Sequence, residues 1–491
     1  MSKEISKKTK SSLYWNISLK IPYELFRFVS SILVARVLDP HDFGIVSIAT
    51  MVIYYSNSFS NFGFNQALVQ RNDIQNRHIN SVFTFDLTIS ILLGIVVYYS
   101  SEPISSYFNS PESNEVIKAL SVVFVLTTLH DLPYVLLRRD IEFKILAIVD
   151  MFREVLMAVI TLILAYNGFK YWSIVIGHLI PLLLTSIYLL IKVKQPLRLT
   201  YDIVSLKELF GFSLWSFVQM QVYFISNRVD RVLIGKFINT TMLGLYEKSK
   251  SLSQMPSESL GDKINSVLFS SFSRLQNDKQ GITNIFKKGL VINSLITFPI
   301  YCGMYSVSDQ FVLVLLGEQW KDMILTFEIM AVAGLFASLN GLIASLTVGS
   351  GNYKNYIVRF TISMFVLLIG GILFVEHGIE AVAVVFVIYT IFLFFIGFNL
   401  VKTIIPVGWN TLLRCIGPAL ISSILMIVLV NSIEYYYLNE LSMLNLLLLV
   451  IIGGVFYSLL VTILPSISLD IIRKPLFRDI KKLYSKIYNN N

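Results

Sequence analysis

Long apolar runs recur along the chain and are separated by short polar turns rich in Pro, Gly, Asn and Asp. The runs are roughly 18 to 25 residues long, the length that an α-helix needs to cross about 30 Å of hydrocarbon. The pattern predicts an all-α polytopic membrane protein with about fourteen transmembrane helices. The expected helices span 11–36, 43–62, 79–100, 116–137, 145–166, 171–191, 209–235, 242–268, 284–306, 325–348, 355–375, 379–401, 410–431 and 441–464.

Basic residues fall mainly in alternate segments between these helices. With the N-terminus inside, the segments on the cytoplasmic side hold 27 Lys and Arg residues, and those on the opposite side hold 4. Cytoplasmic loops of membrane proteins carry such an excess of basic residues. The sequence therefore predicts cytoplasmic N- and C-termini and a multi-pass location in the bacterial cytoplasmic (inner) membrane.

Composition narrows the function classes further. Of the 491 residues, 55% are hydrophobic and 14% are charged, against roughly 25% charged residues in soluble domains. The net charge of +9 is spread between apolar runs, so no nucleic-acid partner is expected. The sequence contains neither a phosphate-binding loop of the P-loop type nor a metalloprotease zinc motif. We expect no catalytic residues, no metal and no cofactor, and therefore a secondary transporter rather than an enzyme.

A weak internal repeat relates two parts of the chain at an offset of 200 residues. Five residues of the first copy recur in the second, and the last of them are Gly44 and Gly244. Six predicted helices separate the copies, and an even number makes the repeats parallel, related by an axis along the membrane normal. This predicts two parallel six-helix lobes around a central cavity, with two helices appended. The predicted divisions are an N-lobe at 1–200, a C-lobe at 201–402, helices 13 and 14 at 403–465 and a basic cytoplasmic tail at 466–491.

Two turn motifs resemble those of a known family. The stretch LVARVLDPHDFG at 33–44 is similar to the turn after the first helix of the polysaccharide-transport flippases. The stretch FGFNQALVQR at 62–71 is similar to the loop after their second helix, and the segments at 230–235 and 317–320 also look similar to family segments. The chain thus resembles the oligosaccharide-lipid flippases of the MOP exporter superfamily (multidrug, oligosaccharidyl-lipid and polysaccharide exporters).

The resemblance implies two helical bundles around a cavity that opens alternately to either face. The implied cargo is a polyprenyl-pyrophosphate-linked oligosaccharide, flipped across the membrane lipid for O-antigen, capsule or exopolysaccharide synthesis. Implied partners are a polysaccharide polymerase and chain-length machinery, and coupling to a proton or sodium gradient is left open. The alternatives are a cation-coupled multidrug exporter of the same superfamily and an integral-membrane polysaccharide polymerase, which the short external loops disfavour.

Charged groups inside the lipid mark candidate cargo contacts, because each charge there is costly unless it faces a cavity or a partner. Lys20, Glu24 and Arg27 are spaced i, i+4, i+7 and so share one face of the first predicted helix. Basic groups there suit a pyrophosphate, and the Arg guanidinium matches its oxygens best. The alternative is an internal salt bridge that only packs the first helix.

Two further helices carry polar stripes. Glu247, Lys250 and Gln254 lie on the eighth predicted helix, and Asn57 and Asn61 lie on the second, its counterpart in the first repeat. We expect these stripes to be facing walls of one cavity, unless the cytoplasmic half of the eighth helix emerges into water. Ion coupling needs a carboxylate whose occupancy differs between two states, and the candidates are Glu24 and Glu247.

The seventh predicted helix carries a third polar set. Tyr223, Asn227, Arg228 and Arg231 are the members expected to contact the cargo. The helix is otherwise apolar, so these groups need either a wet cavity or partners of their own. The alternative to a cargo contact is that Asp230 and Arg231 form a satisfied ion pair near the external surface.

Overall fold

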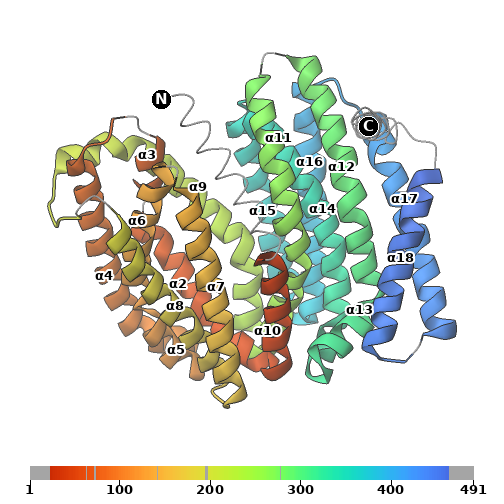
Figure 1. Ribbon diagram of the computed structural model, residues 1–491, viewed down its shortest axis with the longest axis horizontal. Helices are drawn as coiled ribbons and strands as arrows, with labels where there is room; N and C mark the ends of the chain where they lie inside the picture. Colours follow the sequence, from red (N-terminus) through yellow and green to blue (C-terminus); the bar gives the residue numbers. More distant parts are fainter. Residues whose placement is uncertain are drawn as a thin grey trace, which may run out of the picture. The chain divides into compact units, whose positions relative to one another are not determined.

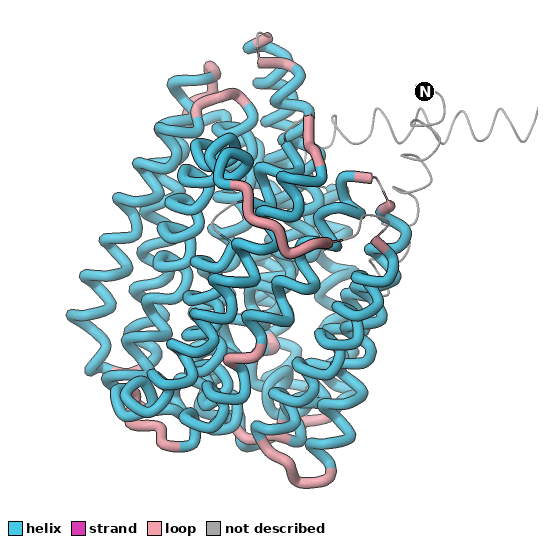
Figure 2. The backbone as a smooth tube through the Cα atoms, turned by 90° about the vertical axis from the view of Figure 1, so that its left-hand side faces the viewer, coloured by secondary structure: helices cyan, strands magenta, loops and turns pink. Residues whose placement is uncertain are grey.

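The architecture is helical throughout the part of the chain that the computed structural model describes. Within that part the chain contains no strand (Figure 2). The prediction of an all-α protein is confirmed. Lys20 and the basic tail lie outside the described residues, which are 23–61, 64–70, 73–140, 142–193, 197–276, 278–438 and 440–463.

The chain forms two compact units, Met1–Glu247 and Lys248–Asn491. The lobe boundaries that the sequence predicts stay a prediction. The first unit includes a helical segment at 23–37. Its other helices are α2 (Pro40–Asn61), α3 (Phe64–Gln70), α4 (Asn76–Tyr107), α5 (Glu112–Leu120), α6 (Val123–Arg139), α7 (Phe143–Tyr166), α8 (Tyr171–Lys192), α9 (Ile203–Phe237) and the start of α10 (Thr240–Pro256).

Helix α4 packs against most of its neighbours in the first unit, contacting α2, α5, α6 and α9. Its apolar side meets residues such as Phe124 of α6 in a core from which water is excluded. Burying a large apolar side chain of this kind stabilises the fold by roughly 1.5–3 kcal/mol. The core therefore fixes α4 as the scaffold against which the polar residues of this unit are positioned.

The last turns of α9 are fastened to the end of α4. The Lys236 ammonium donates a hydrogen bond to the Tyr107 carbonyl at 2.7 Å and lies 4.3 Å from the centre of the Tyr107 ring. At the other end of α9, the Asp202 carboxylate accepts a hydrogen bond from the Val204 N–H at 3.0 Å and caps the helix. Both ends of this 35-residue helix are thus fixed by side-chain contacts.

The starts of α2 and α10 meet without intervening side chains. Gly44 lies against the Thr240 carbonyl, and Gly244 lies against the Pro40 carbonyl. A β-carbon at either glycine would overlap the opposite backbone. Glycine is therefore required at both positions for the two helices to approach this closely.

The second unit is built around α12, α14, α16 and α17, which share one apolar core. Figure 1 shows α12, α14 and α16 running side by side. Pro256 ends α10, and a π-helical turn at Ser257–Gly261 interrupts the single helix predicted at 242–268. The following helices are α11 (Asp262–Arg274), α12 (Lys279–Ser306), α13 (Ser308–Gln310), α14 (Ile324–Gly349), α15 (Tyr353–Phe374), α16 (Ile379–Ile404), α17 (Trp409–Tyr437) and α18 (Met443–Ile463).

Among the described residues, nine helical stretches are long and apolar enough to cross a membrane. Helices α2, α7, α9 and α10 are not among them. Helices α2, α9 and α10 carry most of the polar positions that the sequence singles out, and α7 contains four charged residues of its own, Lys144, Asp150, Arg153 and Glu154. The nine stretches are Asn76–Tyr107, Glu112–Arg139, Tyr171–Lys192, Lys279–Ser306, Glu318–Gly349, Tyr353–His377, Ile379–Ile404, Trp409–Tyr437 and Met443–Ile463.

Candidate functional site

The end of α9 and the start of α10 bring two pairs of polar side chains together in the first unit. Arg231 is 7% exposed and pairs with Glu247, donating from Nη2 to Oε1 at 3.0 Å. The Tyr246 hydroxyl donates to the buried Asp230 carboxylate at 2.6 Å. Consecutive residues of a helix point about 100° apart, so Asp230 and Arg231 take different partners on α10. The two pairs hold the helices together.

Arg228 lies one turn before Arg231 and has a different environment. Its guanidinium carbon is 5.1 Å from the ring centre of Tyr54 on α2 and 5.8 Å from that of Phe224. Among the described residues no carboxylate forms an ion pair with Arg228. Aromatic faces attract the cation without neutralising its charge as a carboxylate would. Arg228 is therefore able to bind an anion.

The first helical segment holds the second predicted basic group. The Arg27 Nε lies 3.8 Å from the Glu24 carboxylate. Tyr23 donates a hydrogen bond to Glu154 of α7, and Arg27 also attracts that carboxylate. The Glu24–Arg27 pair is present, as the packing alternative requires, and a cargo contact by Arg27 stays a prediction. Lys20 lies outside the described residues.

The polar positions of α2 and α9 are only partly described. The Asn57 side chain accepts a hydrogen bond from the Thr127 hydroxyl of α6 at 3.2 Å. The Asn227 carbonyl accepts one from the Arg231 guanidinium at 3.4 Å. The side chains of Asn61 and Tyr223 lie outside the described part of the structure. Asn57 and Asn227 thus have structural contacts, and their predicted roles in cargo binding are untested.

The second unit buries the lysines of α10. Lys250 is 1% exposed, and its ammonium lies 4.1 Å from the centre of the Phe386 ring on α16. Lys248 is 4% exposed, and Gln254 is half-buried one turn after Lys250. A cation over an aromatic face is stabilised when it is withdrawn from water. The ring compensates part of the cost of burying Lys250, and a role in cargo binding remains a prediction.

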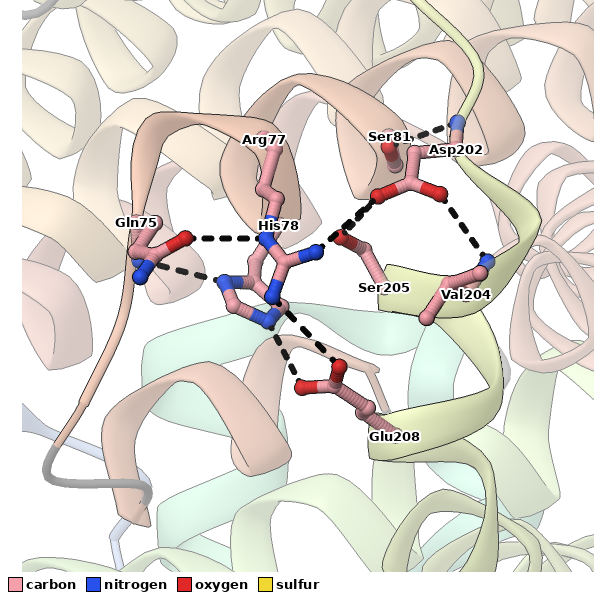
Figure 3. Close-up of polar contacts among 8 residues, drawn as sticks. All are labelled: Gln75, Arg77, His78, Ser81, Asp202, Val204, Ser205 and Glu208. Carbon is pink, nitrogen blue, oxygen red and sulfur yellow. Dashed lines mark hydrogen bonds and ion pairs between the residues drawn. The ribbon is translucent and has the colours of Figure 1, made fainter.

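A polar cluster that the sequence did not indicate joins the start of α4 to the start of α9 (Figure 3). The Glu208 carboxylate lies 3.1 Å from His78 Nε2 and 3.5 Å from Arg77 Nη2. The Arg77 guanidinium also lies 3.7 Å from Asp202. The Ser205 hydroxyl donates to Asp202 at 2.6 Å, and this hydrogen bond is the main reason why the pKa of Asp202 lies below its usual value.

The hydrogen bonds of His78 fix its tautomer. The Gln75 backbone N–H donates to His78 Nδ1 at 3.1 Å, so Nδ1 is unprotonated. The proton of the neutral ring is then on Nε2 and is donated to Glu208. His78 is 1% exposed. The sequence gave no signal for this role, because His78 lies in a polar segment just before the predicted helix at 79–100 and its partner lies 130 residues away.

These contacts define the class of protein. Among the described residues no group of three His, Cys, Asp or Glu side chains is arranged to hold a metal. The Arg231 guanidinium is buried against Glu247 and the Asp230 carboxylate is buried against Tyr246, in a unit that also contains long apolar helical stretches. Intramembrane charges of this kind are typical of proteins that move polar solutes across lipid.

Comparison with known proteins identifies the family. A family model described as "Polysaccharide biosynthesis protein" matches residues 33–325, which is more than half of the chain. The chain therefore belongs to this family of polysaccharide biosynthesis proteins. The resemblance predicted from the two turn motifs is confirmed.

Individual relatives and one solved structure agree with this assignment. A "membrane protein in cps region" of Klebsiella pneumoniae is 23% identical, over 94% of this chain and 96% of the relative. The lipopolysaccharide biosynthesis protein WzxC of Escherichia coli strain K12 is 22% identical, over 75% and 76%. The fold is similar to that of the lipid II flippase MurJ in an inward closed conformation, with a TM-score of 0.77, 16% identity and coverage of 92% and 98%. The apolar helices and these relatives identify a multi-pass protein of the bacterial inner membrane.

Proposed function

We propose that the protein is a flippase that moves lipid-linked oligosaccharide units across the inner membrane for surface polysaccharide synthesis. The observation that carries this proposal is the family match over residues 33–325. The name of WzxC assigns that relative to lipopolysaccharide biosynthesis, and the solved structure of similar fold is named a lipid II flippase. The cargo is a polyprenyl-pyrophosphate-linked oligosaccharide, and the protein is a secondary transporter that works by alternating access.

The half-buried arginines Arg27 and Arg228 support an anionic cargo. A pyrophosphate offers several oxygens to one guanidinium, and such charge-assisted hydrogen bonds are about twice as strong as neutral ones. Arg228 has aromatic contacts in place of a carboxylate partner, whereas Arg231 is paired with Glu247. Arg228 therefore binds the pyrophosphate and Arg27 assists it, while Arg231 has a structural role.

The proposed topology has fourteen crossings and cytoplasmic termini. Nine described stretches are apolar enough to cross the membrane by themselves. The remaining five crossings are the segment at 23–37, α2, α7, α9 and the α10–α11 pair. Single cysteines in 102–115 and 432–440 should react with impermeant reagents from outside, and those in 192–208 and 271–283 only from the cytoplasm. Reversed labelling would overturn this topology.

The proposed function is tested by deleting the gene in a strain without a redundant transporter. Lipid-linked repeat units should accumulate on the cytoplasmic leaflet, and surface polysaccharide should fall until the gene is restored. The matched control is a deletion of the first glycosyltransferase, which should remove the lipid-linked units altogether. Unchanged lipid-linked pools and normal surface polysaccharide after deletion would refute the proposal.

A further inference from the structure

Helix α4 buries an acidic side chain that has no partner. Asp86 is 3% exposed and lies ten residues after Asn76, the first residue of α4, which is about 15 Å along the helix. Its Oδ1 is out of reach of water and has no hydrogen-bond partner among the described residues. In the same part of the chain no Lys or Arg acts on it. An ionised carboxylate is strongly disfavoured in such a place, so Asp86 needs a group that neutralises its charge.

Asp131 of α6 is the charged neighbour of Asp86. Helix α4 packs against α2, α3, α5, α6 and α9, and among the described residues Asp131 is the only charged group that acts on Asp86. Two neighbouring carboxylates repel each other, so such a pair retains one proton between them. One turn after Asp86, the Ser90 and Thr128 hydroxyl oxygens are 2.6 Å apart. This hydrogen bond fixes α4 against α6 close to the two acids.

The surroundings of the two acids decide which of them is ionised. His130 Nδ1 lies 3.0 Å from Asp131 Oδ1, and the Asp131 side chain is 39% exposed. His130 Nε2 is buried and has no partner among the described residues. The neutral ring with its proton on Nδ1 leaves no N–H unpaired. This hydrogen bond and the exposure both stabilise an ionised Asp131, so the proton of the pair lies on Asp86.

A proton fits Asp86 better than a metal cation does. A metal cation needs several oxygen ligands around it, but Asp86 Oδ1 is closed to any particle as large as water. The nearby Ser90 hydroxyl is already bonded to Thr128. Among the described residues no three His, Cys, Asp or Glu side chains converge on one point. A proton bound to a carboxylate oxygen needs none of this space.

We propose that Asp86 is a proton-binding residue of the transporter and that it exchanges its proton with water through Asp131. Loss of the proton leaves two like charges between α4 and α6, and their repulsion favours an arrangement in which these helices lie further apart. Pro133 lies inside α6, two residues after Asp131. A proline removes one backbone hydrogen bond, so α6 is able to bend there. That this proton is coupled to movement of the cargo rests on the proposed function.

The bound proton can be detected without any cargo. Infrared spectra of the full-length protein in lipid are recorded at neutral pH, and the spectrum of Asp86→Asn is subtracted from that of the wild type. The difference should contain the C=O stretching band of a protonated carboxylic acid. Glu102→Gln, at an exposed glutamate of the same helix, is the matched control, and subtracting its spectrum should leave no such band. Absence of the band from the first difference would overturn the inference.

Two further measurements distinguish a proton from a metal cation and from a folding defect. Replacing choline chloride by sodium chloride should leave the carboxylic-acid band unchanged, and its disappearance in sodium would contradict the inference by showing a sodium site. Asp86→Glu keeps the carboxyl group and should retain such a band. An ionised side chain in a folded Asp86→Glu variant at neutral pH would also count against a proton site here.

Coupling is measured separately, in proteoliposomes that contain the lipid-linked cargo. A pH gradient should accelerate flipping by the wild type and by Glu102→Gln, and this stimulation should be lost in Asp86→Asn. Equal stimulation of Asp86→Asn would show that the proton on Asp86 is not coupled to transport. If the wild type flips no cargo although the infrared band is present, the proposed function fails and the proton-binding residue stands.

Discussion

Gly44 and Gly244 make the same contact in opposite directions. Each lies four residues after the start of its helix, and each touches the backbone carbonyl of the first residue of the other helix, Thr240 or Pro40. A reciprocal contact of this kind is what two related segments make around a two-fold axis. The offset of 200 residues that suggested an internal repeat thus coincides with a specific backbone contact.

Enlarging either glycine should separate the two helix starts. We expect Gly44→Ala and Gly244→Ala each to destabilise the protein by about 1–3 kcal/mol, because the added methyl group overlaps a carbonyl that cannot rotate away. Thermal unfolding of the purified variants measures the effect. Gly454→Ala is the matched control, since nothing lies within 4 Å of its β-carbon position. The contact has no energetic importance if all three variants melt alike.

Removing one member of the Arg231–Glu247 pair should destabilise the folded protein more than removing both. Glu247→Ala leaves a buried guanidinium without its partner, which costs about 3–5 kcal/mol. Adding Arg231→Met to Glu247→Ala should restore much of the stability, because no buried charge is then left without a partner. The measurement is a double-mutant cycle on melting temperature. Normal stability of Glu247→Ala would mean that Glu247 is free to act in ion coupling instead.

Arg228 should determine cargo affinity. We expect Arg228→Ala to weaken binding of the lipid pyrophosphate by roughly 10- to 100-fold, the loss of a charge-assisted hydrogen bond or two. Arg228→Lys should retain only part of the wild-type affinity. An ammonium lacks the planar set of N–H donors of a guanidinium and interacts less well with the Tyr54 ring. Flipping by the variants in proteoliposomes, normalised to the amount of inserted protein, is the measurement. If Arg228→Ala flips the cargo at the wild-type rate, Arg228 does not bind the pyrophosphate and Arg27 is the remaining candidate.

The Asp202 cap should weaken in acid. Its pKa in the folded protein is lowered, chiefly by the Ser205 hydrogen bond, so the carboxylate stabilises the fold above its unfolded-state pKa of about 3.9. That contribution is lost as the pH falls through the lower folded-state pKa. The melting temperature of Asp202→Asn should therefore approach that of the wild type below about pH 4. A difference that does not change with pH would exclude this charge effect.

Hydrophobic periodicity predicted most of the fold. The fourteen expected ranges coincide with helix over most of their described residues, because a run long enough to cross lipid has few alternatives. The exceptions are a turn at 121–122, which divides the range 116–137 into α5 and α6, and residues 441–442, which precede α18. The interruption at Ser257–Gly261 was not predicted, although Pro256 marked where the helix would be disturbed. The external segment at 307–324 was interpreted as a loop, and the structure has helical turns there. These turns depend on packing against other helices, which a single sequence does not display.

The choice of partners was the least predictable feature of the site. Sequence spacing identified Arg231 and Glu247 as intramembrane charges but not as a pair, since they lie on different helices. The sequence also gave no sign of the cavity that Asp309, Glu328 and Glu434 line together, because these acids come from three separate segments. Local spacing reports which residues share a helix face, whereas sites between helices depend on the tertiary fold.

Helix α9 is joined to α4 at both ends, by Glu208 with His78 and Arg77 and by Lys236 with Tyr107. Contacts at one end would allow α9 to pivot about that point, but contacts at both ends prevent it from swinging relative to α4. The two helices are therefore expected to move together as one rigid body. A displacement at the start of α9 would then move Lys236 by a similar amount, and the apolar contacts between the two helices would be kept.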